Sequence, residues 1–193
     1  MIKLSGIDKS FGTKTVLRGF DLEVAPGERV CLTGSSGCGK STVLAIASGT
    51  LAPDAGEVRI CENVRMAYLY QDDRLLPWLD ALENVAVTGV PQDRAVEMLT
   101  LMGLGEDIRK RPGQLSGGMR RRLAIARALA YGGDIFYLDE PLQGLDGDTA
   151  ERVTGVMLDS LRGRTVLMVS HNDAEIEALA TRVVHMDARE DAR

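Results

Sequence analysis

The sequence predicts an α/β fold in which a mainly parallel sheet forms the core, with an antiparallel β part at the N-terminus and a helical subdomain. Three observations predict it. A glycine-rich loop connects a short apolar strand to a helix near the start of the chain. Apolar strands alternate with helical patterns in the last part of the chain, and the stretch between these two parts has helical spacing alone. The 193 residues suffice for one sizeable core with an appended lobe.

The N-terminal part of the chain contains mostly strand patterns. A turn-like segment, residues 10–14, separates the first two strands, and the third strand runs directly into the glycine-rich loop. The helical pattern that follows covers residues 41–48 and ends at the stop signal Gly49. The predicted strands in this part are residues 2–7, 16–24, 29–33, 56–61 and 64–70.

Helical spacing then dominates, and we interpret residues 72–112 as a helical insertion into an otherwise αβ chain. We therefore predict a single domain over residues 1–193. Its core αβ lobe comprises residues 1–71 and 113–187, and the insertion forms the helical subdomain.

Beyond the insertion, apolar runs typical of buried parallel strands alternate with helical patterns. Asn172 followed by Glu175 predicts a capping box at the start of the last helix. The polar tail, residues 187–193, is expected to fray. From residue 80 onward, the predicted helices are 80–87, 93–102, 123–130, 149–161 and 172–180, and the predicted strands are 135–138, 165–169 and 183–186.

Charge and cysteine content narrow the classes of function. Acidic residues outnumber basic ones by 28 to 23, and this net charge of −5 argues against a nucleic-acid partner, which needs a basic face. Neither a signal peptide nor an apolar run near ~20 residues is seen, so a membrane role would run through a partner. Cys31, Cys38 and Cys61 show no metal or disulfide spacing, which predicts a reducing compartment. Cys31 lies in an apolar run and is predicted to be a core residue.

The glycine-rich loop matches the pattern of a phosphate-binding loop. Its glycines let backbone N–H groups turn toward a triphosphate, and the helix after it directs its positive end to the same place. Lys40 is expected to bind the β- and γ-phosphates, and Ser41 to offer its hydroxyl to Mg²⁺. The candidate nucleotide-binding residues of the loop are Gly34, Ser35, Ser36, Gly37, Cys38, Gly39, Lys40, Ser41 and Thr42.

An acidic pair, Asp139-Glu140, follows a buried strand pattern. Its carboxylates should emerge at the edge of the sheet where ligands bind in open α/β folds. Asp139 suits the binding of Mg²⁺, directly or through water, and Glu140 is a candidate to polarise an attacking water. An ordinary pair of carboxylates at a strand end is the alternative, and the phosphate loop upstream disfavours it.

Several further strings resemble the ATP-hydrolysing subunit of ABC transporters, in the same order and over nearly the whole chain. Gln71 matches the glutamine loop of that family, and Phe11 the aromatic residue that stacks on adenine, although a lone Phe is more often a core residue. The other matching strings are the signature Leu115-Ser116-Gly117-Gly118-Met119, the strand with its acidic pair at 135–141, Gly144-Leu145-Asp146, and Ser170-His171-Asn172.

The resemblance implies a head-to-tail dimer in which each ATP lies between the phosphate loop of one subunit and the signature of the other. In that family the glutamate, histidine, lysine and glutamine at positions 140, 171, 40 and 71 are catalytic. Ser41, Gln71 and Asp139 would bind Mg²⁺, and Asp146 would lie in the loop that crosses the dimer interface. ATP and Mg²⁺ are the implied ligands.

Among the members of this family, the wording of the motifs resembles the importers of nitrate, sulfonate and taurine. Met119 replaces the Gln that usually ends the signature, and the string Gln71 to Trp78 is also similar. The resemblance implies permease subunits as partners, a solute-binding protein acting through the permease, a second copy or a homologue in the dimer, and a peripheral place on the cytoplasmic face of the membrane. Leu75, Leu76 and Trp78 would contact the permease, and their packing within the helical subdomain is the alternative.

Other functions stay open at this stage. An ABC-type ATPase in DNA repair or translation, a non-catalytic module that dimerises on ATP, and an unrelated phosphate-loop kinase or GTPase are the alternatives; the last would leave the signature unexplained. The run Arg120–Arg122 fits a solvated helix face or an interface equally well. His185 is interpreted as structural.

Overall fold

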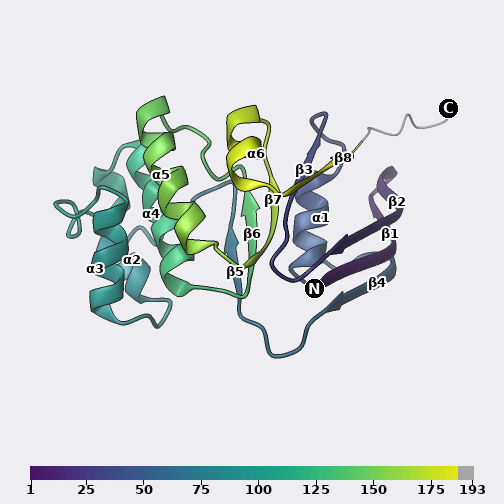
Figure 1. Cartoon of the computed structure of the whole chain (residues 1–193), viewed down its shortest axis with the longest axis horizontal. Coiled ribbons are helices and arrows are strands. Elements are labelled where there is room, and N and C mark those ends of the chain that lie inside the picture. Colours follow the sequence, from purple (N-terminus) through teal and green to yellow (C-terminus); the bar gives the residue numbers. More distant parts are fainter. Residues whose placement is uncertain (187–193) are drawn as a thin grey trace.

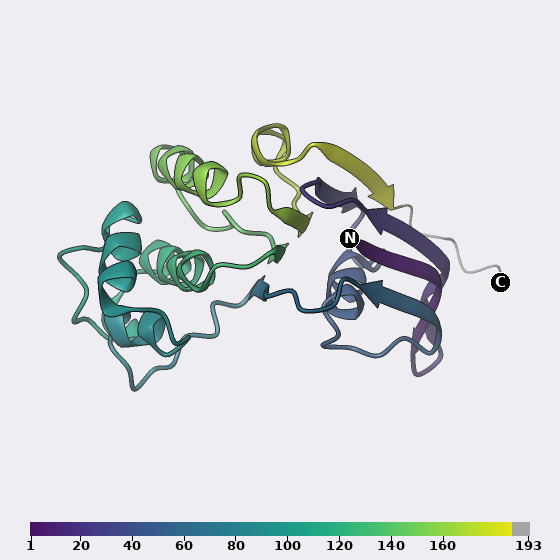
Figure 2. The ribbon, with the colours of Figure 1, turned by 60° about the horizontal axis from the view of Figure 1, so that its bottom comes forward.

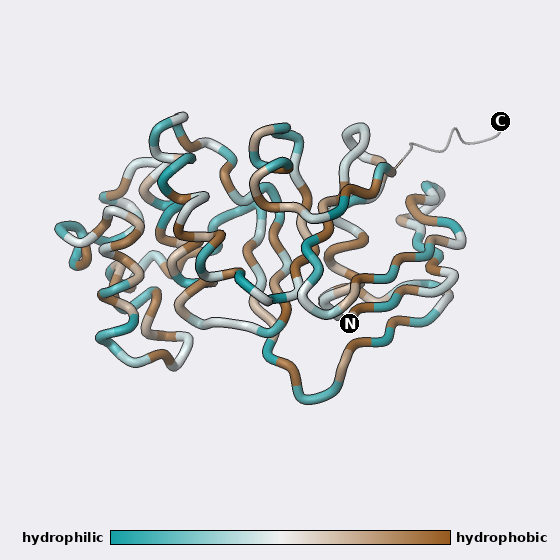
Figure 3. The backbone as a smooth tube through the Cα atoms, in the orientation of Figure 1, coloured by the Kyte–Doolittle hydropathy of each residue, from teal (hydrophilic) through white to brown (hydrophobic). Residues whose placement is uncertain are grey.

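The computed structural model describes residues 1–186, which form two sheets and the helices around them (Figure 1). The smaller sheet is antiparallel, in the order β2-β1-β4. Its strands are β1 (Ile2–Phe11), β2 (Lys14–Val24) and β4 (Ala55–Ile60). In Figure 3 hydrophilic and hydrophobic residues alternate along these strands, as expected of a sheet with one covered face.

The larger sheet is parallel throughout, in the order β5-β6-β7-β3-β8. Its strands are β3 (Arg29–Gly34), β5 (Met66–Leu69), β6 (Ile135–Asp139), β7 (Thr165–Val169) and β8 (Arg182–Met186). Every residue of β6 and β7 is buried, which confirms the prediction of buried parallel strands. Because parallel strands end at the same edge, the loops that follow β3, β5, β6 and β7 meet there.

The parallel sheet separates two hydrophobic cores. Along β6, Ile135 and Tyr137 face the core shared with the antiparallel sheet and α1, whereas Phe136 and Leu138 face the other core. In Figure 2 the helices α2 to α5 lie on one side of the parallel strands and the antiparallel sheet lies on the other. The helices are α1 (Lys40–Ala47), α2 (Ala81–Ala86), α3 (Gln92–Leu101), the 3₁₀-helix η1 (Pro112–Gln114), α4 (Gly117–Tyr131), α5 (Gly147–Ser160) and α6 (Asp173–Leu179).

The helical part begins with a segment that Asn84 of α2 holds in place. This wholly buried side chain accepts from the backbone N–H of Leu76 and donates to the carbonyls of Leu76, Leu79 and Asp80. Helices α2 and α3 pack against α4, whose sequence lies outside the predicted insertion. The division into residues 72–112 and the core lobe stays a prediction.

The element boundaries differ most from the predictions at two places. The turn between β1 and β2 is only residues 12–13, because Gly12 adopts a positive φ of 60° that closes a tight hairpin. Helix α4 begins at Gly117, earlier than residue 123, where its apolar spacing begins. The glycines and arginines of its first turns hide the apolar spacing, but the Ser116 hydroxyl caps the helix by accepting from the N–H of Met119.

The cysteines and the apolar segments can now be located in the structure. Cys31 is fully buried, as predicted, and Cys31, Cys38 and Cys61 are all free thiols. No helix within residues 1–186 is long and apolar enough to cross a membrane. The tail at 187–193 lies outside the described residues.

Candidate active site

A pocket of about 430 Å³ opens at the carboxyl edge of the parallel sheet. Most of the residues that line it were singled out in the sequence, whereas Gly34, Ser35 and Cys38 of the phosphate loop do not line it. The lining comprises Phe11, Lys14, Val16, Ser36, Gly37, Gly39, Lys40, Ser41, Thr42, Gln71, Asp139, Glu140, Val169 and His171. Phe11 is 50% exposed at its rim, so it is not a core residue, and its ring is available to a ligand.

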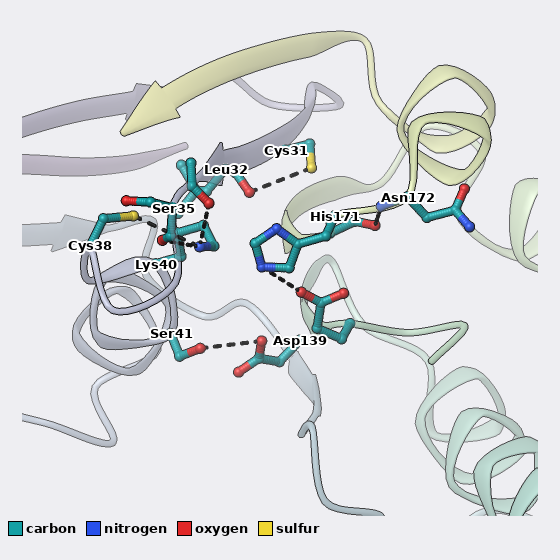
Figure 4. Close-up of polar contacts among 12 residues, drawn as sticks. Cys31, Leu32, Ser35, Cys38, Lys40, Ser41, Asp139, His171 and Asn172 are labelled. Carbon is teal, nitrogen blue, oxygen red and sulfur yellow. Dashed lines mark hydrogen bonds and ion pairs between the residues drawn. The ribbon is translucent and has the colours of Figure 1, made fainter. Parts of the chain in front are cut away.

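The phosphate loop curls around the side chain of Lys40 (Figure 4). The buried Lys40 ammonium donates to the carbonyls of Gly34 and Ser35, each at 2.9 Å. Gly39 has a φ of 106°, and a Cβ there would lie 2.9 Å from Val16. Glycine is therefore required at this position by conformation and by space, and the loop can present its backbone N–H groups to an anion.

Asp139, at the end of β6, meets Ser41, the second residue of α1. The Ser41 hydroxyl donates to Asp139 Oδ1 at 3.3 Å (Figure 4). Burial raises the pKa of Asp139, whereas the hydrogen bond from Ser41 and the charge of Arg121 act in the opposite direction. A hydroxyl and a carboxylate form a hard oxygen donor set, which fits Mg²⁺ held by one or two protein groups together with phosphate oxygens.

Glu140 and His171 approach each other across the pocket. Glu140 Oε1 lies 3.2 Å from His171 Nε2, and the backbone N–H of Glu140 donates to the carbonyl of Val169. Glu140 has a φ of 48°, which is unusual for a residue with a side chain. Burial raises the pKa of the Glu140 carboxyl, and the neighbouring His171 lowers it.

The segment after β7 is fixed by a buried carboxylate that sequence reasoning assigned to a capping box. Asn172 does cap α6, because it accepts from the N–H of Glu175. The Glu175 side chain turns inward instead of completing the box: its Oε2 accepts from the Ser170 hydroxyl at 2.7 Å. Burial raises the pKa of Glu175 to about 6. The Ser170 hydroxyl also accepts from the N–H of Asn172, which fixes both neighbours of His171.

The signature does not contribute to this pocket in the same chain. Ser116 and Gly117 are exposed at the N-terminus of α4, whereas Leu115 is buried and Met119 half-buried. Asp146 caps α5 by accepting from the N–H of Thr149, which lowers its pKa. Gly118 lies next to Leu145, so the signature and the loop at 144–146 form one continuous surface outside the pocket.

Arg121 fits neither interpretation of the run Arg120–Arg122. It is only 4% exposed, so it is neither a solvated residue nor an interface residue. Its guanidinium donates to five backbone carbonyls behind the pocket, those of Tyr70, Gln71, Asp139, Glu140 and Pro141. The position of Arg121 in a helical pattern does not predict these contacts, because the carbonyls that accept from it belong to two segments far from it in the sequence.

The segment after Gln71 ends in an exposed aromatic side chain. Leu75 packs against the helical core, whereas Trp78 is 64% exposed. Val87 and Leu101 of the same region are also exposed apolar side chains. His185, interpreted as structural, lies on β8 with its Nδ1 3.2 Å from the Thr33 hydroxyl, and it does not line the pocket.

Comparisons with known proteins agree with this geometry. Residues 17–143 match the family model described as ABC transporter. The chain is 39% identical over 190 residues to the aliphatic sulfonates import ATP-binding protein of Cupriavidus necator, covering 91% of this chain and 62% of that protein. It is 40% identical to the protein of the same name in Ralstonia nicotianae, covering 95% of this chain and 68% of that one. It is also 40% identical to the lipoprotein-releasing system ATP-binding protein of Maricaulis maris, covering 89% and 88%.

The fold has been seen in solved structures of the same kind. An ATP-binding cassette in a dimeric post-hydrolysis state bound to ADP and Pi superimposes with a TM-score of 0.88 at 29% identity, covering 98% of this chain and 97% of that one. A dimeric bacterial ABC transporter cassette gives the same TM-score at 30% identity, covering 100% and 97%.

A phosphate loop after one parallel strand, with an acidic pair after another strand of the same sheet, defines the class of phosphate-loop nucleotide hydrolases. Within that class, the chain belongs to the ABC transporter family, as an ATP-binding cassette of the kind that hydrolyses ATP. The α/β fold predicted from the sequence is thereby confirmed.

Proposed function

We propose that this chain is the ATP-hydrolysing subunit of an importer of a small organic anion, in the chemical class of the sulfonates. One observation carries the enzymatic part: the pocket brings the phosphate loop, Asp139 and the Glu140–His171 pair to one edge of the sheet. The names of the sulfonate-import relatives support the substrate class. The chain spans about two thirds of the length of those relatives, so their substrates are carried over as a proposal.

Each side chain at the pocket then has a role. Lys40 binds the β- and γ-phosphates once ATP displaces the carbonyl contacts that its ammonium now makes. Glu140 polarises the attacking water, and His171, whose Nε2 lies 3.2 Å from Glu140 Oε1, orients the water and the γ-phosphate. Phe11 stacks on the adenine at the rim of the pocket. Gln71 senses Mg²⁺ and links the helical subdomain to the site.

The metal site uses the oxygen donors already paired at the sheet edge. Ser41 and Asp139 hold Mg²⁺, with Gln71 lining the same pocket. When bound, Mg²⁺ neutralises the charge on the phosphate oxygens. The burial that raises the pKa of Asp139 also favours a cation beside this carboxylate.

The active form is a head-to-tail dimer. The exposed Ser116 and Gly117 at the N-terminus of the 15-residue helix α4 offer backbone N–H groups to the γ-phosphate bound by the opposite subunit. Asp146 lies in the interface loop. The dimeric solved relatives support this arrangement. The dimer acts from the cytoplasmic face of the membrane, bound to permease subunits through Leu75, Leu76 and Trp78.

The test of the proposed chemistry is Glu140→Gln. This variant removes the water-polarising carboxylate but keeps the shape of the side chain. We expect it to bind ATP normally and to lose about 1,000-fold in turnover, while ATP drives it into a stable dimer detectable by size-exclusion chromatography. The control Lys40→Ala should lose ATP binding itself. Turnover near that of the unmodified chain would remove Glu140 from this role.

A further inference from the structure

We propose that Arg121 is a positioning residue for hydrolysis: its buried guanidinium fixes the backbone that aims the Glu140 carboxylate and ties that backbone to the segment of Gln71. The inference rests on the proposed function, because it assigns to Arg121 a role in the reaction at the same pocket. It goes beyond that function by adding a residue that does not line the pocket.

The first half of the evidence is the contact between Arg121 and the acidic loop. The Arg121 Nη2 donates to the carbonyl of Asp139 at 2.8 Å and to that of Glu140 at 2.7 Å, and its Nε donates to the carbonyl of Pro141 at 2.9 Å. Three consecutive carbonyls are thus bound by one rigid, planar group. The N–H of Glu140 is bound separately by Val169 of the neighbouring strand β7. The peptide units on both sides of the Glu140 Cα are therefore held.

This double attachment matters because Glu140 has a φ of 48°. A residue with a side chain keeps such a conformation only where its surroundings impose it. If the guanidinium were removed, the loop could relax toward an ordinary backbone conformation. The carboxylate would then turn away from His171, which it now approaches at 3.2 Å.

The second half of the evidence is the contact with the glutamine segment. The Arg121 Nη1 donates to the carbonyls of Tyr70 at 2.7 Å and Gln71 at 3.1 Å, and it lies 3.4 Å from Asp73 Oδ1. Arg127, further along α4, binds the carbonyls of Asp73 and Arg74. The helix that begins at the signature therefore holds both pocket-lining segments, and a movement of α4 would be felt at Gln71 and at Glu140 together.

The charge of Arg121 is balanced within the chain. Burial lowers its pKa, whereas the nearby carboxylates of Asp73, Glu175 and Asp139 raise it. An arginine stays protonated even when buried, so the Arg121 guanidinium keeps all its N–H donors. A lysine in its place has one nitrogen and cannot reach carbonyls from two segments at once.

The test is Arg121→Lys, which keeps the charge and the buried stem. Because misplacing a reacting group slightly is costly, we expect kcat to fall about 100-fold. The Kd for ATP, measured by equilibrium dialysis in the absence of turnover, should stay within about twofold, since Arg121 does not touch the pocket. Should this variant fail to melt cooperatively, Arg121→Gln, which keeps two N–H donors but ends where the arginine Nε lies and so loses the Nη contacts, replaces it with the same expectation for kcat and Kd.

The matched control is Arg122→Lys. Arg122 is the next residue of α4 and also donates to two carbonyls, those of Met102 and Gly103, but it contacts neither pocket segment. We expect it to lose thermal stability and to retain kcat within about twofold. Equal kcat values for the two lysine variants would show that Arg121 only stabilises the fold and would overturn the proposal.

A double variant separates this proposal from the proposed function. If Arg121 acts through Glu140, adding Arg121→Lys to Glu140→Gln lowers turnover no further. A second loss of about 100-fold in the double variant would overturn the inference, because Arg121 would then act elsewhere. Full activity of Glu140→Gln alone would instead refute the proposed role of Glu140. Loss in Glu140→Gln with full activity in Arg121→Lys would refute the inference alone.

Discussion

Glu140 illustrates how the site depends on single residues and their backbone. Its left-handed conformation costs roughly 1–3 kcal/mol, which the surrounding hydrogen bonds must offset. The sequence predicts that the carboxylates of Asp139 and Glu140 lie at the edge of the sheet where ligands bind. A buried strand pattern before this pair and the phosphate loop upstream are enough for that prediction. The sequence does not predict the contacts of Arg121 or the inward turn of Glu175. A buried arginine and a solvated one look the same in a helical pattern, and so do a capping glutamate and a buried one.

Glu175 carries a prediction at this scale. Its pKa rises from 4.5 to about 6 on folding, so the folded chain binds this proton more tightly than the unfolded chain. The group therefore stabilises the fold fully below pH 4.5, and the free energy of unfolding falls by about 2 kcal/mol as pH rises through 6.

We expect Glu175→Gln, which still accepts from the Ser170 hydroxyl, to be more stable than the unmodified chain by about 1–2 kcal/mol at pH 8. The difference should be smaller at pH 5 and vanish below pH 4.5. Urea unfolding at both pH values measures it. A variant that is less stable at pH 8 than at pH 5, relative to the unmodified chain, would contradict the assignment.

At the scale of elements, helix α4 begins earlier in the chain than its apolar spacing predicts. It starts at the signature, packs on α2 and α3, and holds two pocket-lining segments through Arg121 and Arg127. The strands were predicted well because a run such as residues 165–169 is buried on both faces and continuously apolar. Apolar spacing alone does not predict the start of α4, because a serine cap and two glycines mark it; the resemblance of residues 115–119 to the signature does place the start of a helix there.

The segment between β5 and α2 carries the second prediction. Asn84 holds its backbone, so the exposed Trp78 is presented from a fixed position. We expect Trp78→Ala to weaken assembly with the permease while ATP binding stays unchanged, since aromatic anchors dominate interfaces. Co-purification from gently solubilised membranes measures assembly. The control is Val87→Ala, because Val87 is another exposed apolar residue, at the C-terminal end of α2. Equal recovery of permease with both variants would contradict a role of Trp78 in assembly.

At the scale of the whole molecule, the pocket and the signature lie apart in one chain. The phosphate loop, Asp139, Glu140 and His171 line the pocket, whereas Ser116 and Gly117 are exposed on a surface outside it. The order of the motifs along the sequence predicts this division only through the resemblance to the family. Spacing alone does not say which motifs share a chain's own site. A second subunit related by a twofold axis would bring the two surfaces together.

The most direct test of this account mixes two inactive variants. Lys40→Ala lacks a working phosphate loop and Ser116→Arg lacks a working signature, so each alone should hydrolyse almost no ATP. In a mixed dimer, one site combines the intact phosphate loop of the second variant with the intact signature of the first. The account predicts that ATPase activity returns on mixing. The two variants and their mixture should all melt cooperatively at the same temperature, which shows that each variant is folded. Full activity of Ser116→Arg alone, or no recovery on mixing two folded variants, would contradict it.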